Sequence, residues 1–244
     1  MTNLSSCDIL DVILTIGEYI MELSDTTINI LKNYATINPN IVIGEGNTIK
    51  TISVARNVMS KTEVVETFDS TIGIYDLNEF LGAVSLVKEP RFEVTKDYIN
   101  ISDSRRSVKY FLSDPEMLTS PGKDVNMPET EVKFILDTDT LSDLKKAASN
   151  FGYENISIQP STGAVSLSVV DTDNATSNVF SIDVDGTYPE GADFNFILNV
   201  NNLKVVNEDY DVEISSKLIS HFTSKQSTTE YYIALEKSST YIGE

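Results

Sequence analysis

The chain passes twice through the same order of expected elements, and this repetition limits its fold more than any other feature of the sequence. In each half a strand leads into a capped helix, several strands follow, and a further strand leads into a second helix. The joints at residues 74–77 and 198–201 hold equivalent places in the two halves. The sequence therefore predicts a duplicated α+β protein.

Each expected helix begins after a side chain that can accept hydrogen bonds from the free N–H groups of a first turn. The four starts are Ser24 or Asp25, Asp76, Asp137 and Asn199. The first helix is expected to end near Pro39, since proline cannot continue it, the second near Val87 and the short fourth near Val205. The third carries apolar residues at helical spacing as far as Phe151.

Proline and glycine gather in the middle of the chain, at Pro115, Pro121, Gly122 and Pro128, and indicate a linker. We expect a first domain at residues 21–112, the linker at 113–130 and a second domain at 131–244. Residues 1–20 are expected to be an N-terminal extension outside the natural domain, which would start at Met21. Isoleucines at helical spacing within this extension leave a short amphipathic helix as the alternative.

Composition narrows the range of functions. The chain holds 18 Lys and Arg against 37 Asp and Glu, and its formal net charge of −19 opposes binding of a polyanion over the whole surface. A polyanion would need a small, segregated basic face. One Cys and one His exclude a disulfide framework and most catalytic or metal constellations, so we expect no enzyme activity, no cofactor and no metal. Because no run of 18 apolar residues occurs, we expect no membrane partner.

The expected helices carry few acidic residues on the side opposite their apolar stripe. Short polar side chains and lysines stand there instead: Asn29, Lys32, Asn33 and Thr36 on the first helix, Ser142, Lys145, Lys146 and Ser149 on the third, and Asn201 and Lys204 on the fourth. These positions are either ordinary solvated surface or a face that meets phosphates, from which carboxylates are excluded by repulsion. Contacts of this kind would read charge and shape, not base sequence.

Three blocks of sequence resemble one known family. They are residues 21–38, residues 68–87 with Ile74-Tyr75-Asp76-Leu77-Asn78, and residues 231–240 with Ala234-Leu235-Glu236. The chain resembles the sliding clamps of T4-like bacteriophages, which are DNA polymerase processivity factors. The resemblance implies a DNA-clamp fold of two duplicated domains, each with antiparallel sheets outside and two helices facing a central channel. It also implies a homotrimeric ring that encircles duplex DNA and tethers the replicative polymerase.

The resemblance assigns candidate residues to three surfaces. The DNA channel would be lined by Lys32, Asn33, Arg56, Lys145, Lys146 and Lys204, where Arg56 matches an arginine of the family. Subunits would meet through the strand at 107–112 and an edge strand near 178–184, with contacts from Val108, Tyr110, Phe180 and Ile182, although each could equally be a core residue. A pocket for a partner peptide would use Met117, Leu118, Pro121, Met127, Tyr232 and Ile233.

The partners implied by the resemblance are duplex DNA bound without sequence preference, further copies of the chain, DNA polymerase, an ATP-dependent clamp loader and transcription co-activators of late genes. The protein would act in the cytoplasm of the infected bacterial host and not in the virion. The alternative is a β-rich structural phage protein of the tail or capsid, since strands dominate the sequence and acidity is common in such proteins.

Overall fold

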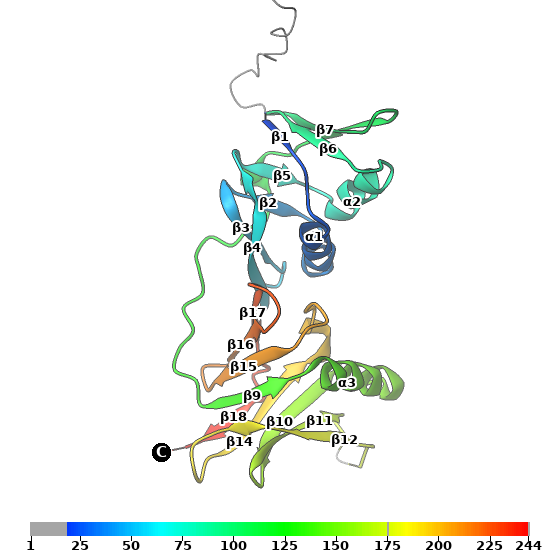
Figure 1. Cartoon of the computed structure of the whole chain (residues 1–244). Helices are drawn as coiled ribbons and strands as arrows, with labels where there is room; N and C mark the ends of the chain where they lie inside the picture. Colours follow the sequence, from blue (N-terminus) through cyan, green and yellow to red (C-terminus); the bar gives the residue numbers. More distant parts are fainter. Residues whose placement is uncertain (1–18, 175, 244) are drawn as a thin grey trace, which may run out of the picture.

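The computed structural model describes residues 19–174 and 176–243 as two halves joined along one sheet (Figure 1). Within these residues there are three α-helices and two short 3-10 turns: α1 (Asp25–Ile37), α2 (Leu77–Ser85), α3 (Thr138–Phe151), η1 (Pro115–Met117) and η2 (Val200–Asn202). In Figure 1 the α-helices lie on the right of the sheets, and the linker descends on the left. The two faces of the molecule therefore differ, with helices on one and the linker on the other.

Two sheets belong to the first half alone. One has the order β1-β6-β7-β8, and the other pairs β2 with β5. Their strands are β1 (Tyr19–Met21), β6 (Arg91–Val94), β7 (Tyr98–Ser102), β8 (Ser107–Phe111), β2 (Ile41–Ile43) and β5 (Ile72–Ile74). Strand β8 is bonded on one side only and forms an edge.

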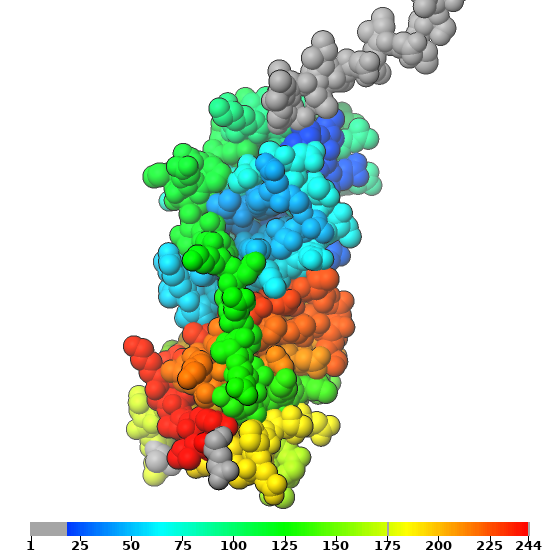
Figure 2. All heavy atoms as spheres, turned by 90° about the vertical axis from the view of Figure 1, so that its left-hand side faces the viewer, coloured from blue at the N-terminus to red at the C-terminus, as the bar shows by residue number. Residues whose placement is uncertain are grey.

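The largest sheet crosses from one half to the other in the order β13-β9-β15-β16-β17-β4-β3. Its strands are β13 (Gly186–Thr187), β9 (Val132–Leu136), β15 (Tyr210–Ser215), β16 (Ile219–Ser224), β17 (Glu230–Ala234), β4 (Val58–Phe68) and β3 (Gly46–Ile52). Strands β17 and β4 make the crossing, with Tyr231 opposite Ser60 and Ile233 opposite Val58. The linker runs over the outside of this junction and spans both halves in Figure 2.

A five-stranded sheet closes the second half in the order β12-β11-β10-β14-β18. Its strands are β12 (Phe180–Val184), β11 (Ala164–Val170), β10 (Asn155–Ser161), β14 (Asp193–Asn199) and β18 (Thr240–Ile242). Strand β12 is the second edge of interest, because β11 is its only neighbour in the sheet. The strand pairs in these sheets are antiparallel, as in hairpins and meanders.

The order of elements confirms the predicted duplication. Strands β1, β6, β7 and β8 recur as β9, β15, β16 and β17, while β2, β3, β4 and β5 recur as β10, β11, β12 and β14. Even single backbone bonds repeat: the N–H of Leu112 donates to Asp97 O, and the N–H of Leu235 donates to Leu218 O. Each half is therefore one copy of the same arrangement.

The predicted helix starts are confirmed for the three α-helices. Ser24 accepts from the N–H of Thr27, Asp76 from the N–H groups of Asn78 and Glu79, and Asp137 from the N–H of Thr140. Buried apolar faces then hold the helices on the sheets, with Ile30, Leu31, Tyr34 and Ile37 in α1 and Leu141, Leu144, Ala147 and Ala148 in α3.

The predicted fourth helix begins where expected, since Asn199 accepts from the N–H of Asn201, but it is shorter than expected. After Asn199 the chain makes only the 3-10 turn η2, and Leu203 leaves the helical region with φ −74° and ψ 54°. Asparagine and β-branched valine are weak helix formers, and burial of Leu203 and Val205 pulls the chain onto the core. The second half thus has one α-helix where the first has two.

The first expected boundary also shifts. Tyr19 and Ile20, which the sequence assigned to the extension, pair with Val94 and Glu93 in β1. The remaining part of that extension, including Cys7 and the other isoleucines of the alternative helix, lies outside the described residues.

The N-terminus of α1 depends on a carboxylate from another element, and this makes a pH-dependent prediction. Glu66 of β4 accepts from the N–H of Ser24 and the hydroxyl of Thr27. Partial burial works against the charged form, but these hydrogen bonds prevail and hold the pKa of Glu66 below its ordinary value of 4.5.

Glu66→Gln should therefore lower the free energy of unfolding at pH 7 by about 1 kcal/mol or less, because solvent still reaches the carboxylate. A lowered folded-state pKa stabilises only above the unfolded value, so the difference should disappear as pH falls below 4.5. Urea denaturation at several pH values measures it, with Glu63→Gln, an exposed position of the same strand, as the control. An equal loss at pH 7 and at pH 3 would contradict the prediction.

Candidate nucleic-acid interface and sheet edges

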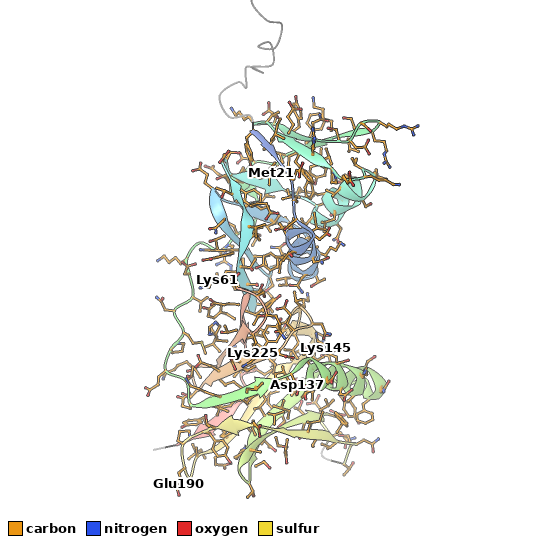
Figure 3. All side chains as sticks on the ribbon, in the orientation of Figure 1. Met21, Lys61, Asp137, Lys145, Glu190 and Lys225 are labelled. Atoms are coloured by element: carbon orange, nitrogen blue, oxygen red, sulfur yellow. The ribbon has the colours of Figure 1, made fainter. Side chains whose placement is uncertain are left out.

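The helix side of the molecule presents the polar faces predicted from the sequence. On α1, Asn29, Lys32 and Thr36 are exposed, and on α3, Lys146 and Ser149 are exposed. Figure 3 shows Lys145 on α3, on the helix side, and Lys61 near the sheet junction toward the linker. The helices from both halves thus offer cations to the same side.

The two lysines of α3 differ in environment. Lys145 is half-buried, and burial lowers the pKa of its ammonium group. Lys146 is exposed and forms an ion pair with Asp143 at 3.3 Å. Surface pairs of this spacing are weak, so Lys146 can exchange Asp143 for a phosphate at little cost.

Asn33 does not act as a free donor on this face. Its amide nitrogen donates to the carbonyl of Lys204 at 2.9 Å, and its amide oxygen accepts from the hydroxyl of Tyr231 at 2.8 Å. The sequence placed Asn33 in the channel, whereas the structure uses both of its amide atoms to join α1 to the second half. Helical spacing could not reveal this, because both partners are about 170 or more residues away.

Arg56 and Lys204 lie at the same junction between the halves. Arg56 is exposed in the turn between β3 and β4, with a φ of +56°. Its neighbour Asn57 donates to the side chain of Asn202 in η2 at 2.9 Å, two residues before Lys204. The fold therefore brings the β3–β4 turn, α1 and the segment after η2 together. Arg56 and Lys204 are the two predicted cations at this junction.

A second group of cations surrounds the end of α2. Lys88, Arg91, Arg105 and Arg106 border a surface hollow of about 630 Å³ together with Asp103 and Glu89. Hydrogen bonds from the backbone N–H groups of Arg105 and Arg106, with the Arg106 guanidinium at 2.8 Å, hold the pKa of Asp103 at about 2. This corner was not among the predicted site residues, and its members come from two separate segments, residues 88–91 and 102–106.

The predicted edge strands are edges in the structure, but their side chains divide between two faces. Val108 and Tyr110 pack toward the core of the first half, and the hydroxyl of Tyr110 donates to Asp76 O at 3.1 Å. Phe180 packs toward the core of the second half, and Ile182 is half-buried. The large exposed apolar residues are the neighbours Phe111 and Val179, at 67% and 58% exposure, which the sequence did not single out.

The six residues predicted for the partner-peptide pocket lie in different environments. Ile233 is fully buried in the core, and Tyr232 is 7% exposed, stacks on His221 and donates to Glu230. Met117 is 83% exposed, and none of the six residues lines the linker cavity or the groove along β9, β13 and β15 described next. Neighbouring strand residues point to opposite faces of the sheet, so Ile233 lies in the core and Tyr232 lies on the other face, against His221.

A cavity of about 460 Å³ does lie between the linker and the junction strands. It is polar, and its charged residues are Lys50, Lys61, Glu63, Asp124 and Glu230. Lys50 pairs with Asp124 of the linker at 2.6 Å, and Lys61 pairs with Glu230 at 3.2 Å. A larger groove of about 710 Å³ runs along β9, β13 and β15, where Ile135 is 44% exposed.

The described residues contain no α-helix long and apolar enough to cross a bilayer, and residues 19–174 and 176–243 contain no group of three His, Cys, Asp or Glu placed to hold a metal ion.

Solved structures share this architecture. The structure superposes on the Proliferating Cellular Nuclear Antigen of Entamoeba histolytica with a TM-score of 0.67 and 11% sequence identity. The match covers 90% of this chain and 98% of that one. The PCNA of A. fulgidus, solved with the C-terminal region of FEN-1 bound, matches with a TM-score of 0.66 and 14% identity. This match covers 91% of this chain and 99% of that one. The fold is therefore that of the sliding clamps.

Sequence comparisons narrow the class. A family model described as DNA polymerase processivity factor matches residues 24–118, and one described as gp45 sliding clamp, C terminal, matches residues 130–237. The sliding clamp of Vibrio phage KVP40 is 29% identical over 223 residues, covering 88% of this chain and 99% of that protein. The sliding clamp of Enterobacteria phage T4 is 29% identical over 234 residues, which cover 91% of this chain and 99% of that protein.

The chain belongs to the sliding clamps of T4-like phages, the family of DNA polymerase processivity factors. The alternative of a structural tail or capsid protein finds no support in these matches.

The buried hydroxyl of Tyr231 yields a prediction about the junction. It donates to Asn33 and accepts from the N–H of Val206 at 3.2 Å. Tyr231→Phe leaves two half-buried partners without this bond and should cost about 0.5–1.5 kcal/mol of unfolding free energy. Tyr75→Phe, at a position that is 71% exposed, should change it by less than about 0.5 kcal/mol. The midpoints of urea unfolding of the two variants and of the unaltered protein measure these changes. A Tyr231→Phe midpoint equal to that of Tyr75→Phe would show that the hydroxyl does not hold the halves together.

Proposed function

We propose that three copies of the chain close head to tail into a ring around duplex DNA. The observation that carries this proposal is the pair of free sheet edges, β8 in the first half and β12 in the second, with the helix side between them. A chain with two different, complementary edges forms heterologous contacts, and such contacts close into rings when the rotation permits. The helices would then line the hole and the sheets would form the outside.

The charges suit a ring that holds DNA without binding it tightly. Lys32 and Lys146 are exposed on the helix side, Arg56 is exposed at the junction, and Lys145 and Lys204 are half-buried. Contacts between such cations and phosphates carry no sequence information. The net charge of −19 repels DNA from the remaining surface. A few exchangeable contacts would let the ring slide, while enclosure prevents its escape.

This arrangement would tether the replicative polymerase to its template by topology. A closed ring cannot thread onto circular DNA, so it needs a partner that opens one interface, and the resemblance assigns this role to an ATP-dependent loader. Polymerase and loader would dock outside the ring. The A. fulgidus PCNA, solved with the C-terminal region of FEN-1 bound, is a precedent for a protein segment that binds a clamp of this fold. Support of late transcription and action inside the infected host cell belong to the same proposal.

Solution mass tests the ring. Sedimentation of the full chain over a dilution series should show three times the mass of one chain at high concentration, falling on dilution, because weak edge contacts obey mass action. The full chain is used since Tyr19 and Ile20 belong to β1. A single-chain mass at every concentration would remove the ring from consideration.

Charge reversal tests the DNA-facing side. Lys32→Glu combined with Lys146→Glu should shorten the products of primer extension by the cognate polymerase several-fold, because two phosphate contacts are replaced by repulsion. Lys123→Glu, an exposed linker position on the other side, is the matched control and should leave product length unchanged. Both variants should retain the oligomeric mass. Equal product lengths for the two would show that DNA does not pass along the helix side.

A further inference from the structure

The junction inside the chain provides a template for the junction between chains. Strand β17 ends the sheet of the second half and pairs with β4, and β17 and β4 are the internal repeats of β8 and β12. The free edges of one chain are therefore second copies of two strands whose mutual pairing is seen. That pairing is antiparallel and places Ile233 opposite Val58 and Tyr231 opposite Ser60.

Backbone hydrogen bonds align β17 with β8 residue by residue. The bond from Leu235 N–H to Leu218 O repeats that from Leu112 N–H to Asp97 O. Likewise Glu236 N–H donates to the strand before η2, as Ser113 N–H donates to the strand before α2. Tyr110 thus corresponds to Ile233, Val108 to Tyr231 and Phe111 to Ala234. Burial agrees, since Tyr110 and Val108 pack inward as their counterparts do.

The two hairpins align β4 with β12. In the β3–β4 hairpin the last bonded pair before the loop joins Ser53 N–H to Val58 O at 2.8 Å. In the β11–β12 hairpin the last pair before the loop is Val169 with Phe180. Both Val58 and Phe180 pack inward. Phe180 therefore corresponds to Val58, and Val179 to Asn57.

We propose that β8 of one copy pairs with β12 of the next in this same antiparallel register, with Tyr110 opposite Phe180, Val108 opposite Ile182 and Phe111 opposite Val179. The proposal rests on the proposed ring. In the β17–β4 pairing inside the chain, the N–H of Ala234 donates to Asn57 O at 2.8 Å. Ala234 and Asn57 correspond to Phe111 and Val179, so we expect the same backbone hydrogen bond between Phe111 and Val179 of neighbouring chains.

The exposed apolar residues support this register independently of the repeat. Phe111 and Val179 are 67% and 58% exposed in the single chain, and the register brings them together on the outer face of the joined sheet. The Phe111 ring is already positioned by Tyr98, with ring centroids 6.3 Å apart, and by the Lys109 ammonium 5.2 Å from its centroid. A shift of two residues would leave one apolar side chain facing solvent.

Charge distinguishes the two kinds of junction. Inside the chain, Glu230 of β17 stands opposite Lys61 of β4 and pairs with it at 3.2 Å. Between chains the signs are exchanged, because Lys109 is on β8 and Asp183 is on β12, one diagonal step apart in the proposed register.

Disulfide cross-linking of the full chain tests the register. Cys7→Ser removes the single cysteine, and three pairs of cysteines are then compared: Phe111→Cys with Val179→Cys, Phe111→Cys with Ser181→Cys, and Lys109→Cys with Val179→Cys. The second and third pairs match registers shifted by two residues in either direction. Directly opposed positions satisfy disulfide geometry and diagonal ones do not, so the first pair should link neighbouring chains at least about tenfold faster under mild oxidation. Non-reducing gels of the products should show species of up to three chains.

Faster linking of either control pair, in protein that retains the oligomeric mass, would overturn the register and leave the ring intact. Protein that sediments as one chain and links none of the pairs would overturn the ring itself. A charge exchange gives an independent check: Lys109→Asp and Asp183→Lys should each weaken assembly, and the double variant should restore it at least in part. Additive weakening in the double variant would show that these two charges do not meet.

Discussion

The antiparallel pairing of β17 with β4 is the interaction on which the rest of this structure depends. It joins two copies of one folding unit into a seven-stranded sheet, and it satisfies the backbone groups of two strands that would otherwise be open edges. The buried bonds of Tyr231 and Asn33 tie α1 across the same junction. Because the halves are joined in this way, their helices share one side, and the repeats of these two strands, β8 and β12, are left as sheet edges.

This division of the surface explains how so acidic a chain can serve DNA. The exposed cations of α1, α3 and the β3–β4 turn are gathered on the helix side, while carboxylates occupy other surfaces and helix starts. At helix starts they complement the macrodipole and cap free N–H groups. The proposed ring needs loose contact inside and no contact outside, and segregated charge would provide both.

What could be predicted from the sequence was mostly local. Ser24, Asp76 and Asp137 cap their own helices within three residues, so these starts could be read directly. The fourth helix starts at its predicted cap, Asn199, but it is a 3-10 turn that ends at Asn202, because burial of Leu203 and Val205 competes with a segment of weak helix formers. The surroundings of Asn33 and Ile233 could not be predicted, because each depends on an element far away in the chain: Asn33 bonds to the second half, and Ile233 lies in the core on β17, next to β4.

The sequence by itself determined the duplication, the family, the capped helices and the polar helix faces, since each is expressed by short-range patterns of side chains. Only the tertiary structure decided which polar side chains remain available, which strands stay unpaired and which apolar residues are left uncovered. Phe111 and Val179 illustrate the difference: each follows an ordinary strand alternation, and their exposure comes from the end of a sheet order that no local pattern encodes. Hydrogen-bond pairing between distant segments sets that order, and it therefore becomes visible only in the folded chain.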